Sequence, residues 1–276
     1  MQKFDRTTPV TVALRAQSGT VDITAADHTA VQVDVVPLDG SEAAAEAART
    51  TQVGLDGDTL YIQTPQVSGW QWRRVPKLAI TVRVPTGSGI AARTASADVR
   101  AAGRYSVAQV EAASADVRVE EVSGDAQLKA ASGDLTVGRV GGGLRMSSAS
   151  GDLKIGDVMG DVSADTASGD ITVRSVGGSL RVRTASGDIE VGVVRRGQTN
   201  LRSASGDVEV GVAAGTGVWL DVSTASGTTR NDLSMGGGPA EPGSPGKEAA
   251  TLELRIRTAS GDVRIRRVTG DVPAAA

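Results

Sequence analysis

Apolar residues occupy alternate positions through most of the chain, in short runs separated by glycine-containing turns. The segment 150–167 shows the pattern: Leu153 and Ile155 form one run, Val162 and Ala164 form a second, and a Gly-Asp pair precedes each. Alternation with a period of two predicts β-strands that bury one face. Two short strands of this kind cannot form a core alone, so each unit must pack on its neighbours.

The unit repeats along the chain. The tetrapeptide Ser-(Gly/Ala)-Asp-(Val/Leu/Ile) begins at residues 96, 114, 132, 150, 168 and 186, at a constant interval of 18 residues. It recurs at residue 205, as Ser-Gly-Thr-Thr at residue 226, and again at residue 260. The interval before residue 260 is one period plus 16 residues, and the excess coincides with the Gly/Pro-rich segment 234–249. We interpret that segment as a flexible insertion in the repeat.

These observations predict an all-β fold: a parallel β-solenoid with 18-residue coils, two strands per coil, stacked about 4.8 Å apart. The repeat domain spans residues 94–272. Residues 1–93 lack the strict period, and we expect them to form irregular, β-rich N-terminal coils that cap one end. Within them, residues 41–50 predict a short helix with Ser41 as its N-cap. The C-terminal end is less protected, because Pro273 is its only evident blocker, and its open edge could pair two copies of the chain into a homo-oligomer.

Composition narrows the classes of function. The 276-residue chain has no Cys and one His, which excludes disulfides, thiolate metal sites and cysteine nucleophiles. Its net charge of −3 argues against a nucleic-acid partner. The sequence has no basic leader followed by an apolar run, and no apolar segment of the roughly 18 residues that a membrane-spanning helix requires. We therefore expect a cytoplasmic protein without a transmembrane segment, which reaches a membrane only through a partner.

The repeats between residues 94 and 272 have the form T-A-S-G-D-(V/I)-x-V, and a V-P-T-G turn at residues 84–87 precedes them. In both features the chain resembles the bacterial "putative adhesin" β-strand-repeat family of unknown function, also called the toast-rack domain. The resemblance covers nearly the whole chain and brings no catalytic motif. It implies a non-enzymatic scaffold or binding surface, in a family often encoded near membrane-anchored or envelope-stress systems.

The aspartates of the motif form one column on the predicted solenoid. Carboxylates about 4.8 Å apart repel by about 0.9 kcal/mol per neighbouring pair even in water, so another interaction must offset the repulsion. We interpret the column as a structural turn ladder in which Ser and Asp oxygens accept backbone N–H groups. A calcium ladder is the alternative, but the Gly-Gly-x-Gly-x-Asp turns of calcium-binding β-rolls are absent, and we predict neither a metal nor a cofactor. The ladder comprises Ser96, Asp98, Ser114, Asp116, Ser132, Asp134, Ser150, Asp152, Ser168, Asp170, Ser186, Asp188, Ser205, Asp207, Ser260 and Asp262.

Charged residues occupy both outward faces of the predicted rod. Two positions after each motif Asp, the residues change from basic at Arg100 and Arg118 to acidic at Glu190 and Glu209, and Arg264 follows near the far end. These side chains form either a solvated surface with cross-strand ion pairs or a docking face for a partner protein or an anionic polymer. The same two interpretations apply to the basic residues of the other sheet, which are Arg145, Arg181, Arg183, Arg202, Arg255 and Arg257.

The best local binding candidate lies between residues 66 and 77. There Trp70, Trp72, Arg73, Arg74 and Lys77 combine aromatic and basic side chains, which are enriched at binding hot spots. The alternative is that the two tryptophans cover the side or end of the solenoid.

Nothing in the sequence supports catalysis. His28 lies in a polar loop, and the acids are repetitive rather than one distinct pair in an aromatic-lined groove. The sequence therefore predicts a non-catalytic scaffold or binding protein, not an enzyme, that mediates protein–protein or envelope-associated assembly with an unidentified protein partner. A carbohydrate- or calcium-binding, adhesin-like repeat protein is the alternative.

Overall fold

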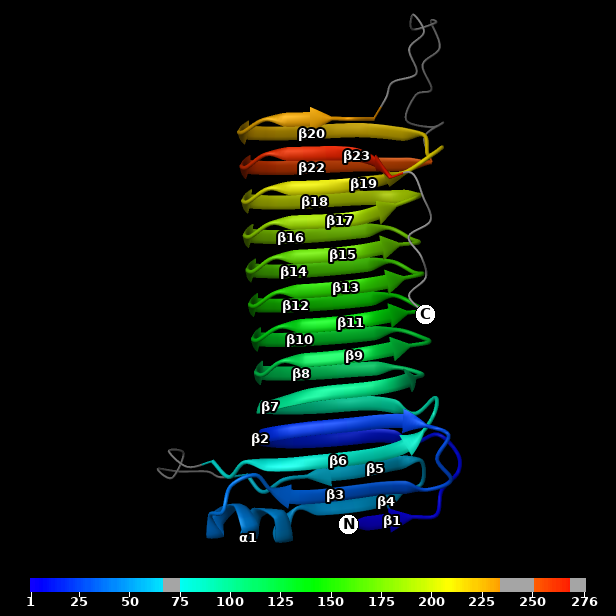
Figure 1. Cartoon of the computed structure of the whole chain (residues 1–276), viewed down its shortest axis with the longest axis vertical. Coiled ribbons are helices and arrows are strands. Elements are labelled where there is room, and N and C mark those ends of the chain that lie inside the picture. Colours follow the sequence, from blue (N-terminus) through cyan, green and yellow to red (C-terminus); the bar gives the residue numbers. More distant parts are fainter. Residues whose placement is uncertain (67–74, 234–250, 269–276) are drawn as a thin grey trace, which may run out of the picture.

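The computed structural model describes residues 1–66, 75–233 and 251–268, which form an elongated rod of stacked strands (Figure 1). The N-terminal elements are β1 (Gln2–Phe4), β2 (Thr11–Ala26), β3 (Val31–Pro37), α1 (Glu42–Thr50), β4 (Gln52–Asp56), β5 (Thr59–Gln63), β6 (Leu78–Pro85) and β7 (Gly89–Tyr105). The repeats form β8 (Ala108–Ser114), β9 (Val117–Val122), β10 (Ala126–Ser132), β11 (Leu135–Val140), β12 (Leu144–Ser150), β13 (Leu153–Val158), β14 (Val162–Ser168), β15 (Ile171–Val176), β16 (Leu180–Ser186) and β17 (Ile189–Val194). The distal elements are β18 (Gly197–Ser205), β19 (Val208–Ala213), β20 (Val218–Ser226), β21 (Thr229–Asn231), β22 (Leu252–Ser260) and β23 (Val263–Val268).

The 18-residue repeat builds the rod. Each coil gives one strand to each of two facing sheets, and β12 pairs in parallel with β10 and β14, each 18 residues away. Inward residues such as Leu135, Leu153 and Ile171 are 0% exposed and fill the space between the sheets. The prediction of an all-β parallel solenoid with two strands per coil is confirmed. In spatial order, the front sheet contains β8, β10, β12, β14, β16, β18, β22 and β20, and the back sheet contains β9, β11, β13, β15, β17, β19, β23 and β21.

The N-terminal elements cover one end of the rod. The long strand β2 pairs along most of its length with β7, and β5 and β6 stack in parallel on the other side of β2. Beyond them β3, β1 and β4 pair in antiparallel fashion, and α1 lies at this end (Figure 1). The predicted N-cap is confirmed: the Oγ of Ser41 accepts the N–H of Ala44 at 3.1 Å.

The far end of the rod does not follow the order of the chain. The strand β22 pairs with β18 on one side and with β20 on the other, and β23 likewise lies between β19 and β21 (Figure 1). The outermost described coil is therefore residues 218–231. Our expectation that the C-terminal coil has an open edge is wrong, because its strands are paired on both sides. The segment 234–249 and Pro273 lie outside the described residues.

Thr199 is a buried polar residue within a column of apolar core residues. Thr199 is 1% exposed, stands between Leu180 and Leu254 of the adjacent coils, and its Oγ1 has no hydrogen-bond partner within the described part of the chain. Burial of an unpaired hydroxyl costs about 1–3 kcal/mol in mutational data. We expect Thr199→Val to stabilise the rod by about 1 kcal/mol, seen as a higher midpoint of urea unfolding.

The matched control for this prediction is Thr184→Val. The Thr184 side chain is also buried, but its Oγ1 donates to the carbonyl oxygen of Ser186 at 3.1 Å, so its removal should lower the midpoint. A Thr199→Val midpoint at or below that of the natural chain would contradict the interpretation.

Candidate functional site: a groove along the front sheet

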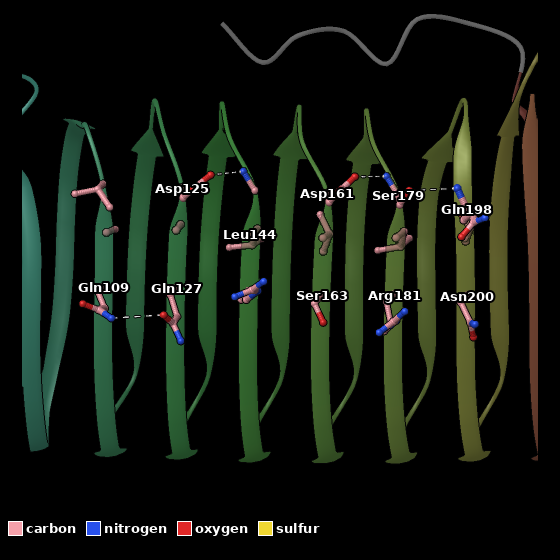
Figure 2. Close-up of a pocket in the computed structure, with 18 of the residues that line it drawn as sticks. Gln109, Asp125, Gln127, Leu144, Asp161, Ser163, Ser179, Arg181, Gln198 and Asn200 are labelled. Atoms are coloured by element: carbon pink, nitrogen blue, oxygen red, sulfur yellow. Dashed lines mark hydrogen bonds between the residues drawn. The ribbon is translucent and has the colours of Figure 1, made fainter.

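A groove of about 910 Å³ runs along the outer surface of the front sheet, from β8 to β22. Two rows of outward side chains line it, one near the corner of each coil and one two residues further along the strand (Figure 2). We call the second row the polar row. Its members are Gln109, Gln127, Arg145, Ser163, Arg181, Asn200 and Arg255.

The stacking of the coils places the polar row in register. Each member lies five residues before its motif Ser and pairs directly with the member on the next coil, so that neighbours are about 4.8 Å apart. The Nε2 of Gln109 donates to the Oε1 of Gln127 at 3.5 Å, and the side chains of Gln127, Ser163 and Asn200 follow one line across the strands (Figure 2). The groove therefore offers amide, hydroxyl and guanidinium groups at regular intervals.

Aromatic side chains lie near both ends of this row. Tyr61 of β5 is 49% exposed and sits beside Ala13 in a second hollow of about 380 Å³, which is also lined by Gln109. Near the distal end, the guanidinium of Arg255 lies 5.5 Å from the centroid of the Trp219 ring. The front sheet thus combines a long polar middle with a ring near each end.

Two carboxylates of the groove are tied to the backbone. The Oδ1 of Asp125 accepts the N–H of Gly143 at 2.7 Å, and the Oδ1 of Asp161 accepts the N–H of Ser179 at 2.7 Å (Figure 2). These bonds join successive coils at the corner. Their geometry makes the two acids supports of the coil stack rather than a matched acid and base.

The predicted turn ladder of Ser and Asp lies at the other corner. The Oδ1 of each motif Asp accepts the backbone N–H of the corresponding residue on the next coil at 2.8–3.1 Å, from Asp98 to Asp262. The aspartates therefore accept backbone N–H groups, and the bonds run between coils; no hydrogen bond of a motif Ser side chain is seen among the described residues. The backbone and side chain of Thr228 donate to Asp262 and, with the nearby charges of Arg230 and Arg264, hold the pKa of this carboxyl below its usual range.

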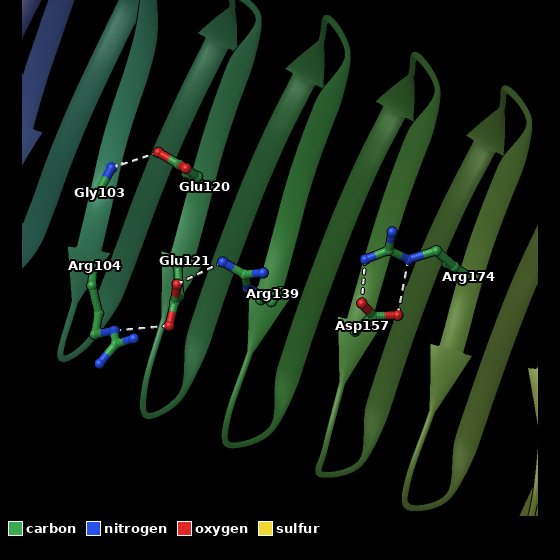
Figure 3. A network of polar contacts seen from close by, with 7 residues as sticks. All are labelled: Gly103, Arg104, Glu120, Glu121, Arg139, Asp157 and Arg174. Atoms are coloured by element: carbon green, nitrogen blue, oxygen red, sulfur yellow. Dashed lines mark hydrogen bonds and ion pairs between the residues drawn. The ribbon is translucent and has the colours of Figure 1, made fainter. Parts of the chain in front are cut away.

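The back sheet carries ion pairs between coils (Figure 3). Glu121 on β9 pairs with Arg104 at 2.8 Å and with Arg139 at 3.0 Å. Two coils further along the rod, Asp157 on β13 pairs with Arg174 on the adjacent strand β15. Partial burial opposes ionisation of Glu121, but the hydrogen bond from Arg139 and the charges of both arginines outweigh it and lower its pKa. The carboxylates Glu121 and Asp157 are therefore paired within the back sheet, whereas Arg100 and Arg118 on the same face are exposed and adjacent in the register.

The Trp–Arg candidate cannot be joined to the groove. Trp70, Trp72, Arg73 and Arg74 lie outside the described residues, and the role proposed for them stays a prediction. Lys77 is exposed, and its carbonyl oxygen accepts the N–H of Leu38 at 2.9 Å.

Sequence reasoning did not single out the uncharged members of the polar row, which are Gln109, Gln127, Ser163 and Asn200. The signal that could have found them is their constant position five residues before each motif Ser.

Neither a metal site nor a membrane span is evident in the part of the chain that the structure describes. Those residues include no group of three or more His, Cys, Asp or Glu side chains that could hold a metal ion. They also include no helix that is long and apolar enough to cross a bilayer.

A family model described as Toastrack DUF4097 matches residues 11–272. The chain belongs to this family. The Toastrack match begins at the first residue of β2 and takes in every strand of the front and back sheets, which confirms the resemblance inferred from the repeats.

Several solved structures resemble this Toastrack chain. A "putative adhesin" from Bacteroides fragilis NCTC 9343 is 12% identical, with a TM-score of 0.46 over 96% of this chain and 95% of that one. A "putative adhesin" from Parabacteroides merdae ATCC 43184 is 8% identical, with a TM-score of 0.34 over 97% and 95% of the two chains. No curated protein matches the sequence.

Proposed function

We propose that this Toastrack protein is a non-catalytic scaffold whose front-sheet groove binds an extended segment of a partner protein. The assemblies that it mediates in this way include assemblies at the cell envelope. The polar row carries the proposal. A groove of about 910 Å³ that is open along a rod suits a linear occupant better than a compact small molecule. Donors and acceptors repeated along a rigid scaffold can bind such an occupant without rearranging, which lowers the entropic cost of association.

The chemistry of the groove supports binding rather than catalysis. Its carboxylates Asp125 and Asp161 each accept a backbone N–H from the next coil, and the third, Glu253, pairs with Arg255 at 2.6 Å. Carbohydrate is the second candidate occupant, favoured by the same amide and guanidinium groups and by Tyr61 and Trp219 near the ends of the row.

A groove-blocking substitution tests the proposal. Ser163→Trp places an indole in the middle of the groove on an outward position of β14, and should abolish recovery of the partner after mild crosslinking in the native host. Thr136→Trp is the matched control, because it adds the same ring at an outward, half-buried position of the back sheet. Equal recovery of the partner by both variants would remove the groove from the proposal. If the natural protein were recovered without any partner protein, carbohydrate would become the favoured occupant, and a glycan array would test it.

A further inference from the structure

Five arginines gather on the distal third of the front sheet. This arginine cluster comprises Arg181 and Arg183 on β16, Arg202 on β18, and Arg255 and Arg257 on β22. Arg183, Arg202 and Arg257 are direct neighbours in the strand register, and like charges directly opposite each other in a sheet are destabilising.

Only two of the five arginines have an ion-pair partner within the described residues. Arg255 pairs with Glu253 at 2.6 Å and Arg257 lies 3.9 Å from Asp221. Arg181, Arg183 and Arg202 are exposed, and within the described residues none of the three makes an ion pair or a hydrogen bond. On the front sheet Asp165 of β14 is the direct register neighbour of Arg183, and an anionic surface from outside the sheet would supply the remaining counter-charge to these three arginines.

The back sheet presents the opposite charge on the neighbouring coils. Its carboxylate face comprises Asp170, Asp188, Glu190, Asp207 and Glu209 on the strands β15, β17 and β19 or at their starts. Glu190 and Glu209 are direct neighbours in the register. Glu190 is exposed, and Glu209 pairs with Arg266 at 2.7 Å and has Arg264 as its neighbour on β23.

We propose that rods of this protein associate side by side, with the arginine cluster of one copy docked on the carboxylate face of the next. The spacing supports a second copy as the occupant, because the same coil stacking of about 4.8 Å sets both rows of charge. If the rods lie parallel with a stagger of one coil, Arg183, Arg202 and Arg257 face β15, β17 and β19. Each of these coils carries a ladder aspartate, and two of them carry a glutamate as well.

Two other anionic partners fit less well. Nucleic acid is disfavoured by the net charge of −3. An acidic segment of another protein would have to match the spacing independently, whereas a second copy carries it already.

A contact between the front sheet of one copy and the back sheet of the next is heterologous. It therefore continues from copy to copy instead of closing as a dimer. Exposed ion pairs are individually weak, so several must act together, and salt should dissolve the assembly because it screens exposed charges. This inference rests on the proposed function in one respect: it names the chain itself as one partner of the scaffold.

Two neutralising variants test the inference. The front variant is Arg181→Gln with Arg183→Gln and Arg202→Gln, and the back variant is Glu190→Gln with Glu209→Gln. Sedimentation velocity of the natural full chain at low salt should show species larger than one copy, which disappear at about 0.5 M salt, where the screening length is a few ångströms. Each variant alone should remain a single copy, with an unchanged far-UV circular dichroism spectrum.

The decisive sample is an equimolar mixture of the two variants. The intact back of the front variant can bind the intact front of the back variant, and the two outer faces then lack three of the five arginines and both glutamates. The mixture should therefore form a one-to-one complex that does not grow. A natural chain that stays single at low salt, a front variant that still assembles, or a mixture that remains single would each overturn the inference. A rod that stays single but still captures its partner through the groove would overturn it while leaving the scaffold proposal standing.

Discussion

Replacing Gly169 by alanine should destabilise the rod by about 3 kcal/mol or more, a large effect for one methyl group. Gly169 adopts a φ of +143°, which L-residues rarely adopt, and a Cβ at this position would lie 2.2 Å from the carbonyl oxygen of Gly151. That oxygen belongs to the backbone of the adjacent coil and cannot move without breaking the ladder. The measurement is the midpoint of urea unfolding, followed by far-UV circular dichroism.

The matched control is Gly54→Ala. Gly54 lies in β4, and no atom lies within 4 Å of the Cβ that it lacks. Alanine is favoured over glycine within a strand by roughly 0.5–1 kcal/mol, so this variant should keep or slightly raise the midpoint. If Gly169→Ala unfolded at the same urea concentration as Gly54→Ala, close stacking of the corners would not be what requires glycine in the motif.

The periodic part of the fold could be predicted from the sequence because its physics is local and repeated. A residue such as Leu153 needs only the same residue type 18 positions away to complete its packing, and it finds Leu135 and Ile171 there. The helix over residues 42–50 was equally predictable, because its N-cap interaction links Ser41 to a residue three positions on.

The 18-residue period does not determine the order in which the coils stack at the far end of the rod. Two coils with the same motif can exchange places without changing any local pattern, and the segment 234–249 gives the chain length to do so. One residue, Thr228, indicates which coil is outermost. Each ladder aspartate accepts an N–H from the coil beyond it, and the outermost described coil, which has no further described coil to bond, carries Thr228 in that position.

The groove was harder to predict because its members share a position and not a residue type. Glutamine, arginine, serine and asparagine follow one another in the polar row, so no composition or motif search selects them. By contrast, the arginines of the front sheet stand out in the sequence, but which of them are paired depends on where Glu253 and Asp221 lie in three dimensions, next to Arg255 and Arg257.

Engineered disulfides should show directly that β22 lies between β18 and β20, because each pair of cysteines either forms a crosslink or does not. The chain contains no Cys, so any crosslink in a double-cysteine variant is the engineered one. Arg202 and Arg257 lie on adjacent strands, as do Arg257 and Ser223. Their spacing of about 4.8 Å falls within the range of roughly 4.4–6.8 Å between the Cα atoms of disulfides.

We therefore expect Arg202→Cys with Arg257→Cys, and Ser223→Cys with Arg257→Cys, to form a disulfide under mild oxidation. The pair Arg202→Cys with Ser223→Cys is the control, because β22 separates these residues by two strand spacings, beyond the roughly 7 Å limit for a disulfide. A gel shift under non-reducing conditions distinguishes the three variants. Crosslinks between residues 202 and 223 and between 223 and 257, without one between 202 and 257, would mean that the coils stack in chain order, with residues 252–268 at the open end. In that arrangement Thr228 would lie inside the stack and break the ladder, and the free edge of the rod would belong to the C-terminal coil.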